Sequence, residues 1–274
     1  MSSQQPISER KRDFYSWQGV ADYIEAKSEV FAVALCVCFA LSSLAIATRR
    51  PFWYDEILTV LAARTPGIKD LLSKFLFGYD QTPPLNAIFV RLSSDVFGWT
   101  ELAARLPSTF FATAGLFILF HRIRSLANGL MGLAAISILT TSFLPMWAYE
   151  ARPYAMLFFA SALALSLWTS APDASDGSTG KTRSILFGVA VMLAVFSHYY
   201  GVLLIVPFIA EEAKNRGLRK LISLPTPFGR VILFLFCPDL AWHSDAISTG
   251  TTAALRRWHC RSCLSLFLSF SKVL

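Results

Sequence analysis

The sequence has little charge: of its 274 residues, 16% are Asp, Glu, Lys or Arg, against about 25% in ordinary soluble domains. A soluble enzyme with so few charged residues would lack polar groups to cover its surface, and it would also have to bury 23 Phe residues. A chain that is 54% hydrophobic does not remain disordered either. The composition therefore argues against a soluble globular enzyme, excludes disorder as the main state, and favours a membrane protein.

Several other features are missing. Five cysteines form no disulfide framework, and Cys36 and Cys38 lie inside an apolar run, where cysteine behaves as a small hydrophobic residue. Residues 1–29 lack a long apolar core, so they predict a cytosolic N-terminal segment rather than a cleavable signal peptide. The net charge of +7 comes from basic clusters between apolar runs, which indicates membrane topology rather than nucleic-acid binding.

Long apolar runs dominate the rest of the chain, and in lipid such runs must be helical to satisfy their backbone. A break at Ser-His-Tyr-Tyr-Gly interrupts the last run, and two amphipathic stretches, 57–63 and 68–77, fit helices in the membrane interface. The runs cover residues 30–48, 85–97, 106–120, 125–149, 154–172 and 185–210. We expect an all-α fold: a polytopic membrane helical bundle of about five to seven transmembrane helices, with interfacial amphipathic helices in the first outer loop.

A topology with a cytosolic N-terminus collects most Lys and Arg on the inner side, provided that residues 85–97 do not cross the membrane. The same topology places three polar clusters on the outer face: residues 54–56, 149–154 and 198–200. These clusters are the candidates for chemistry.

Asp55 and Glu56 follow the first run and three consecutive aromatic residues. A partly desolvated carboxylate can act as a general base, but an acidic pair beside an aromatic belt also occurs without catalysis. Glu101 and Arg105 are four residues apart, a spacing that allows an ion pair on one helix.

Arg152 and Glu150 lie between two strong apolar runs, flanked by tyrosines. An arginine here suits phosphate binding through paired donors, or it extends to the lipid headgroups. His198 interrupts an apolar run, where histidine is more often structural than catalytic. His259-Cys260-x-x-Cys263 is half a zinc pattern without a second ligand pair, so no metal site is predicted.

The order of the motifs is more specific than any one of them. Aromatic-Tyr-Asp-Glu, x-Pro-Pro-Leu, Glu-Leu-Ala-Ala-Arg-Leu-Pro-Ser, Tyr-Glu-Ala-Arg-Pro-Tyr and Ser-His-Tyr-Tyr-Gly occur in succession over residues 30–210. This succession resembles the GT-C superfamily of membrane glycosyltransferases. It is most similar to the bacterial branch related to protein O-mannosyltransferases and to the enzymes that add sugars to lipopolysaccharide.

The resemblance implies transfer of a sugar from a polyprenyl-phosphate carrier to a glycan, lipid or protein hydroxyl on the outer side of the cell membrane. Asp55 would then be the catalytic carboxylate, with Glu56 beside it, and Arg152 would hold the carrier phosphate. Direct displacement with one carboxylate as base would invert the anomeric centre. The other implied pocket residues are Tyr54, Tyr154, His198 and Tyr199. Arg105 and Ser108 match a motif with a structural role. The lipid-linked sugar is the donor, and a divalent metal remains an open alternative.

The resemblance divides the chain into a cytosolic segment, 1–29, a partial GT-C-like catalytic module, 30–224, and an atypical tail, 225–274. Members of this superfamily are longer, so we expect a truncated or frameshifted tail, and the chain is then either an enzyme or an inactive fragment. A multi-pass transporter or flippase-like protein is the alternative. A transporter is expected to show repeat symmetry and charges in mid-span, whereas the chain shows no repeat and its charges cluster at run ends.

Overall fold

The computed structural model describes residues 17–77, 82–168 and 177–216. These residues form helices and no strands, so the predicted all-α fold is confirmed. The chain divides into two compact units, Met1–Leu204 and Ile205–Leu274, and each is taken by itself. The second unit contributes one described helix, α12 (Ile205–Arg216). The proposed tail, 225–274, lies outside the described residues.

The first unit contains ten α-helices and one 3₁₀ helix in its described part. They are α2 (Trp17–Ala26), α3 (Ser28–Ala47), α4 (Tyr54–Ala63), α5 (Ile68–Leu76), α6 (Leu85–Phe97), α7 (Glu101–Leu126), α8 (Gly129–Thr140), α9 (Leu144–Ala148), α10 (Tyr154–Trp168), α11 (Gly177–Ser197) and η1 (Tyr199–Leu204).

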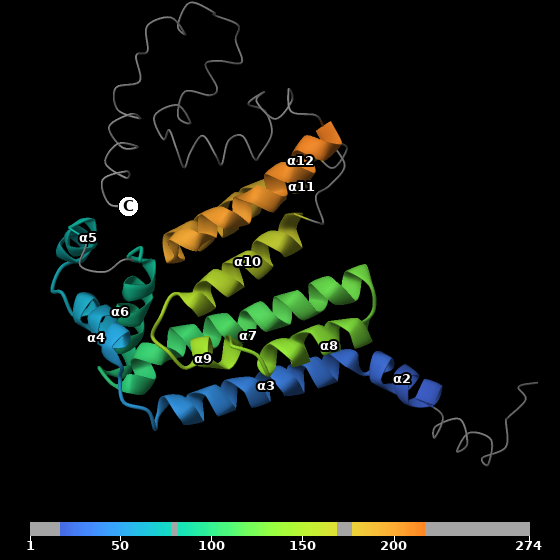
Figure 1. The fold of residues 1–274 in the computed structure, drawn as a ribbon, viewed down its shortest axis with the longest axis horizontal. Helices are drawn as coiled ribbons and strands as arrows, with labels where there is room; N and C mark the ends of the chain where they lie inside the picture. Colours follow the sequence, from blue (N-terminus) through green and yellow to red (C-terminus); the bar gives the residue numbers. More distant parts are fainter. Residues whose placement is uncertain (1–16, 78–81, 169–176, 217–274) are drawn as a thin grey trace, which may run out of the picture. The chain divides into compact units, whose positions relative to one another are not determined.

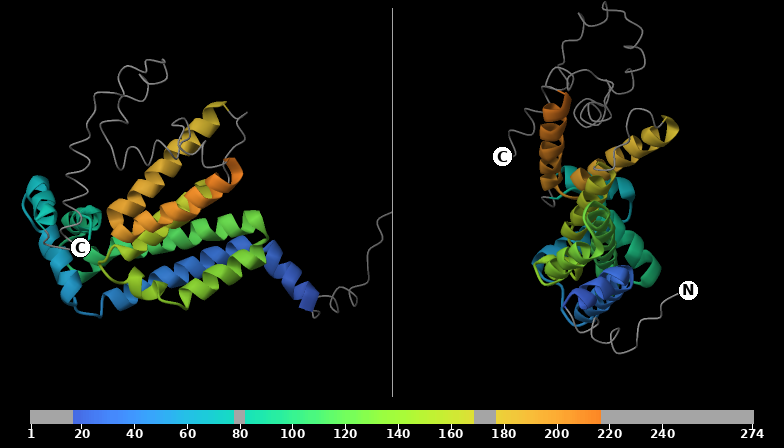
Figure 2. Two further views of the ribbon diagram at one scale, coloured as in Figure 1. Left: turned by 45° about the horizontal axis from the view of Figure 1, so that its top comes forward. Right: turned by 90° about the vertical axis from the view of Figure 1, so that its right-hand side faces the viewer.

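Helix α7 is the centre of this unit and packs against α3, α6, α8, α9 and α10. Figures 1 and 2 show α3, α7, α8 and α10 lying side by side, with α4, α5 and α6 gathered near the N-terminal end of α7. The contact is apolar, and Phe111 on α7 packs edge-on against Phe89 of α6 at a centroid distance of 5.1 Å. Burial of such aromatic and aliphatic surface is the main force that holds the helices together.

A proline within α7 is accommodated by a neighbouring helix. Pro107 has no N–H to donate to the carbonyl four residues earlier, that of Ala103. The hydroxyl of Ser93 on α6 donates to this carbonyl at 2.6 Å. The hydrogen bond that proline removes is thus replaced from α6, which fixes α6 against the first turns of α7.

Two of the described helices, α3 and α7, are long and apolar enough to cross a membrane. On α3 several large side chains, among them Phe31 and Leu41, are exposed, as expected of a surface that faces lipid. The shorter apolar stretches are Gly129–Thr140, Tyr154–Trp168, Thr182–Ser197 and Tyr199–Ala210.

Some helix boundaries agree with the sequence and others differ, most clearly in the run 125–149. Residues 57–63 are helical as predicted, within α4, and the predicted stretch 68–77 is helical as far as Leu76, the end of α5. The break near His198 separates α11 from η1. The charge-free run 125–149 is not one helix: α8 ends at Thr140 and α9 begins at Leu144, with Pro145 in its first turn. Proline is favoured in the first turn of a helix, where its missing N–H has no partner to lose.

Two acidic side chains bind the C-terminal end of α7 and the start of α8. Glu25 on α2 accepts hydrogen bonds from the backbone N–H groups of Gly129 and Leu130, at 2.8 and 2.7 Å, and so caps α8. Glu29 forms an ion pair with Arg124 at the end of α7. Helix α2 is therefore attached to the bundle at this end.

Candidate active site

The first predicted cluster lies where α4 begins. Asp55 and Glu56 are in the first turn of α4, where the positive end of the helix dipole favours acidic side chains. Glu56 Oε2 also accepts a hydrogen bond from the backbone N–H of Trp53, at 3.3 Å, which helps to cap the helix. Local sequence thus presents two carboxylates on one helical turn.

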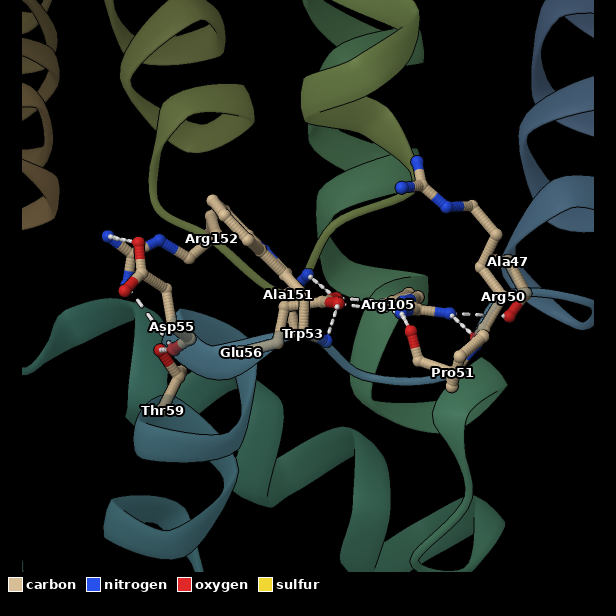
Figure 3. A network of polar contacts seen from close by, with 10 residues as sticks. All are labelled: Ala47, Arg50, Pro51, Trp53, Asp55, Glu56, Thr59, Arg105, Ala151 and Arg152. Atoms are coloured by element: carbon tan, nitrogen blue, oxygen red, sulfur yellow. Dashed lines mark hydrogen bonds and ion pairs between the residues drawn. The ribbon is translucent and has the colours of Figure 1, made fainter.

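Glu56 points inward to Arg105 on α7, and both side chains are almost fully buried (Figure 3). The guanidinium grips the carboxylate with two bonds, from Nε to Oε1 at 2.8 Å and from Nη2 to Oε2 at 2.6 Å. The remaining donors of Arg105 bind the carbonyls of Ala47, Arg50 and Pro51 at 2.8, 2.7 and 3.1 Å. All five N–H groups of the guanidinium are therefore used, and the predicted pair of Arg105 with Glu101 does not form.

The second predicted cluster, the loop between α9 and α10, is fixed by side chains from three other helices. The carbonyl of Ala148, the N–H and carbonyl of Ala151, and the carbonyl of Arg152 all take part. The Thr109 hydroxyl donates to the Ala148 carbonyl at 2.8 Å, and the Ala151 N–H donates to the Glu56 carboxylate at 2.8 Å. The Asn86 amide donates to the Ala151 carbonyl at 3.2 Å, and the Ser108 hydroxyl donates to the Arg152 carbonyl at 3.4 Å. The direction in which Arg152 leaves this loop is set by these bonds.

Arg152 meets Asp55, which joins the first two clusters (Figure 3). Its Nη2 lies 3.4 Å from Asp55 Oδ2, and its Nη1 donates to the Asp55 carbonyl at 3.3 Å. The Arg152 side chain is 9% exposed and that of Asp55 is 38% exposed. Asp55 is therefore accessible to solvent, whereas the Arg152 side chain is largely buried.

The third predicted cluster joins this pair through aromatic rings. The Arg152 guanidinium lies 5.9 Å from the centroid of the Tyr154 ring, and the Tyr154 ring lies 5.3 Å from that of His198. His198 Nδ1 accepts a hydrogen bond from the N–H of Tyr200, at 3.1 Å. In the neutral imidazole this bond leaves the ring proton on Nε2.

Two further predicted residues lie at the surface. Tyr54 is next to Asp55 on the first turn of α4 and is 72% exposed, and Tyr199 at the start of η1 is 49% exposed. The contacts above therefore connect Asp55, Arg152, Tyr154 and His198, with the other two tyrosines exposed beside them.

Glu150 lies in this loop, between the bonded backbone groups of Ala148 and Ala151, and is 8% exposed. Burial raises the pKa of its carboxyl, and the negative charge of Glu56 raises it further, while Arg50, Arg152 and Arg105 act in the opposite direction. The result is a pKa above the ordinary value.

The described residues contain no group of three or more His, Cys, Asp or Glu side chains that could hold a metal ion. His259, Cys260 and Cys263 lie outside the described residues.

Comparison with protein families decides the class. Residues 81–242 match the family model described as dolichyl-phosphate-mannose-protein mannosyltransferase. The chain belongs to this family. No significant match was found among curated proteins or among solved structures.

The mannosyltransferase family consists of membrane glycosyltransferases of the GT-C type that use polyprenyl-phosphate sugars. The matched range includes Arg105, Arg152 and His198, and it extends beyond residue 224. Asp55 and Glu56 precede the range, and they are connected to it by the hydrogen bonds of Arg105, Ala151 and Arg152.

The candidate site also uses residues that sequence reasoning missed. Asn86 and Thr109 hold the backbone of the loop that carries Arg152, and Arg105 pairs with Glu56 across 49 residues. Asn86 directly follows the Pro-Pro-Leu motif and Thr109 directly follows the Leu-Pro-Ser motif. Their place next to these motifs was the available signal, but nothing in one sequence shows which backbone groups they bind.

Proposed function

We propose that this chain transfers a sugar from a polyprenyl-phosphate carrier to a hydroxyl group of a glycan, lipid or protein at the outer face of the cell (inner or plasma) membrane, which it crosses several times. The observation that carries the proposal is the Asp55–Arg152 pair, in which a partly exposed carboxylate lies beside a buried guanidinium. The exposed carboxylate of Asp55 suits a base that must reach an acceptor, and the buried guanidinium of Arg152 suits a fixed binding group for phosphate.

In this proposal Asp55 takes the proton of the acceptor hydroxyl as the acceptor oxygen attacks the anomeric carbon. Arg152 binds the carrier phosphate and stabilises the negative charge that develops on it as the sugar leaves. Attack opposite to the leaving phosphate inverts the anomeric centre. Mannose is the sugar that the family description favours.

We propose a positioning role for Glu56, in place of direct chemistry. Both of its oxygens accept hydrogen bonds, from Arg105, Trp53 and Ala151, and the residue is 1% exposed. Its oxygens are occupied by these bonds and are out of reach of an acceptor. It connects the start of α4, which carries Asp55, to the loop that carries Arg152.

The ring face of Tyr154, next to His198, is the proposed wall for the sugar, because aromatic faces and C–H-rich sugar faces are complementary apolar surfaces. The exposed side chains of Tyr54 and Tyr199 are proposed to complete the pocket on the solvent side.

The test is sugar transfer by the full chain in proteoliposomes, with radiolabelled polyprenyl-phosphate-mannose as donor. Acceptors are a Ser/Thr peptide, an oligosaccharide and a glycolipid, each assayed separately. Asp55→Asn keeps the size of the side chain and removes the base, so we expect transfer to fall by about 10²–10⁴-fold. The matched control is Asp70→Asn, which changes an exposed aspartate in the first turn of α5.

Asp70→Asn is expected to leave transfer unchanged. Transfer by Asp55→Asn at the wild-type rate would remove Asp55 from the mechanism. Absence of transfer by the wild-type chain to all three acceptors, with donor confirmed in the liposomes, would contradict the proposed function for this chain.

A further inference from the structure

Helix α2 carries apolar and polar side chains on different sides. Trp17, Val20 and Ile24 follow one another at intervals of three and four residues, so they share one face of the helix. Asp22 and Glu25 lie on another face. A helix of a soluble protein turns such an apolar face to the core. No residue of α2 is buried, however, and the side chains of Trp17 and Val20 are 92% and 38% exposed.

The hydrogen bonds that attach α2 to the bundle come from its polar side. Glu25 accepts the backbone N–H groups of Gly129 and Leu130, at 2.8 and 2.7 Å, where α2 lies next to the start of α8 (Figure 1). One turn further along, at the start of α3, Glu29 pairs with Arg124. These contacts hold α2 in place without burying any side chain of its apolar face.

The apolar face of α2 continues into the exposed surface of α3. Tyr23, one turn from Val20, packs edge-on against Phe31 of α3 at a centroid distance of 6.5 Å. Both rings remain accessible, at 47% and 41% exposed. Helix α3 is long and apolar enough to cross a membrane, and Leu41 on it is 62% exposed. Two exposed apolar surfaces that join in this way are covered by one apolar phase, the lipid.

We propose that α2 binds the surface of the lipid bilayer. Trp17, Val20 and Ile24 enter the boundary between headgroups and acyl chains, where the amphipathic indole ring is favoured, and Asp22 stays in water. Apolar burial supplies the attraction, because residues 17–27 carry two acidic side chains and one basic side chain. The inference rests on the membrane location that belongs to the proposed function, and is independent of sugar transfer.

Binding of α2 to lipid fixes the depth of the bundle in the bilayer. Helix α3 has 20 residues, which span about 30 Å, the thickness of the hydrocarbon core. The other end of α3 supplies the carbonyls of Ala47 and Arg50, which Arg105 binds. With α2 at the boundary of one leaflet, the candidate site lies at the boundary of the other.

The first test measures the depth of spin labels on the full chain in phospholipid liposomes. The five natural cysteines are replaced by alanine, and Val20→Cys, Asp22→Cys or Leu41→Cys is labelled with a nitroxide. Collisions with oxygen report lipid, and collisions with a water-soluble nickel complex report water. We expect the ratio of oxygen to nickel collisions to be highest at position 41 and lowest at position 22. The label at position 20 should lie between them, about 5–10 Å into the bilayer.

The label positions separate the possible failures. Equal ratios at positions 20 and 22 would overturn the inference, and so would a label at position 20 that is shielded from both reagents, because protein would then cover this face. A label in water at position 41 would contradict the membrane location of α3, on which the inference and the proposed function both depend. Labels at the expected depths in a chain that transfers no sugar would contradict the proposed function alone.

The second test keeps the natural cysteines. The chain contains seven tryptophans, so the contribution of Trp17 is the difference in fluorescence between the wild type and Trp17→Phe. We expect this difference to be quenched by phospholipids brominated in the upper part of the acyl chain and protected from aqueous iodide. Quenching by iodide with protection from brominated lipid would overturn the inference.

Discussion

Replacement of Arg105 by methionine tests the buried pair at the centre of the site. The change removes two bonds to Glu56 and three to backbone carbonyls, and it leaves the Glu56 carboxylate 1% exposed with only the amides of Trp53 and Ala151. Removal of one partner from a buried ion pair costs about 3–5 kcal/mol. For domains of similar size, 1 kcal/mol lowers Tm by about 2–4 °C, so we expect a fall of roughly 6–20 °C.

Tm is measured in detergent from the intrinsic tryptophan fluorescence of the full chain. The double variant Arg105→Met with Glu56→Met removes the uncompensated charge, so we expect it to regain part of the lost stability, although the three carbonyls still lack their donor. The control is Arg64→Met, which changes an exposed arginine that lies 5.2 Å from the Trp99 ring centroid. A change in Tm below about 2 °C for Arg105→Met, or a double variant no more stable than Arg105→Met, would refute the reasoning.

Two other predictions concern the ends of the bundle. A Cβ at Gly201 would lie 2.3 Å from the Ala194 carbonyl oxygen, so Gly201→Ala should displace the turn after α11, lowering both Tm and sugar transfer. Hydrogen bonds from Gly129 and Leu130 lower the pKa of Glu25. The stability that ionised Glu25 gives to the fold is fully present above its ordinary pKa and is lost as pH falls through the lowered pKa. The Tm difference between wild type and Glu25→Gln should therefore vanish in acid. A difference independent of pH would contradict this.

Most helices of the fold could be predicted from the sequence because each depends on local composition. The run ending near residue 48 and the break at His198 correspond to the end of α3 and the gap between α11 and η1. The turn between Thr140 and Leu144 was not readable, since the run contains no charge and Pro145 is compatible with helix on its C-terminal side.

The site was only partly readable for a different reason. The clusters around Asp55, Arg152 and His198 could be identified as polar groups at the ends of apolar runs, and the structure brings them together. The partner of Arg105 could not be found in this way. Helical spacing indicates Glu101, four residues away, whereas tertiary packing supplies Glu56, 49 residues away.

The dependence of Glu56 on distant partners has a consequence for how the protein is made. The guanidinium that neutralises it is 49 residues further along the chain, and the amide of Ala151 is 95 residues further. During synthesis the start of α4 therefore emerges with an unpaired carboxylate, which must stay hydrated until both later segments have been inserted. The start of α4 is therefore expected to be among the last parts to reach its final packing, and a chain that ends before Ala151 would lack one of the partners of Glu56.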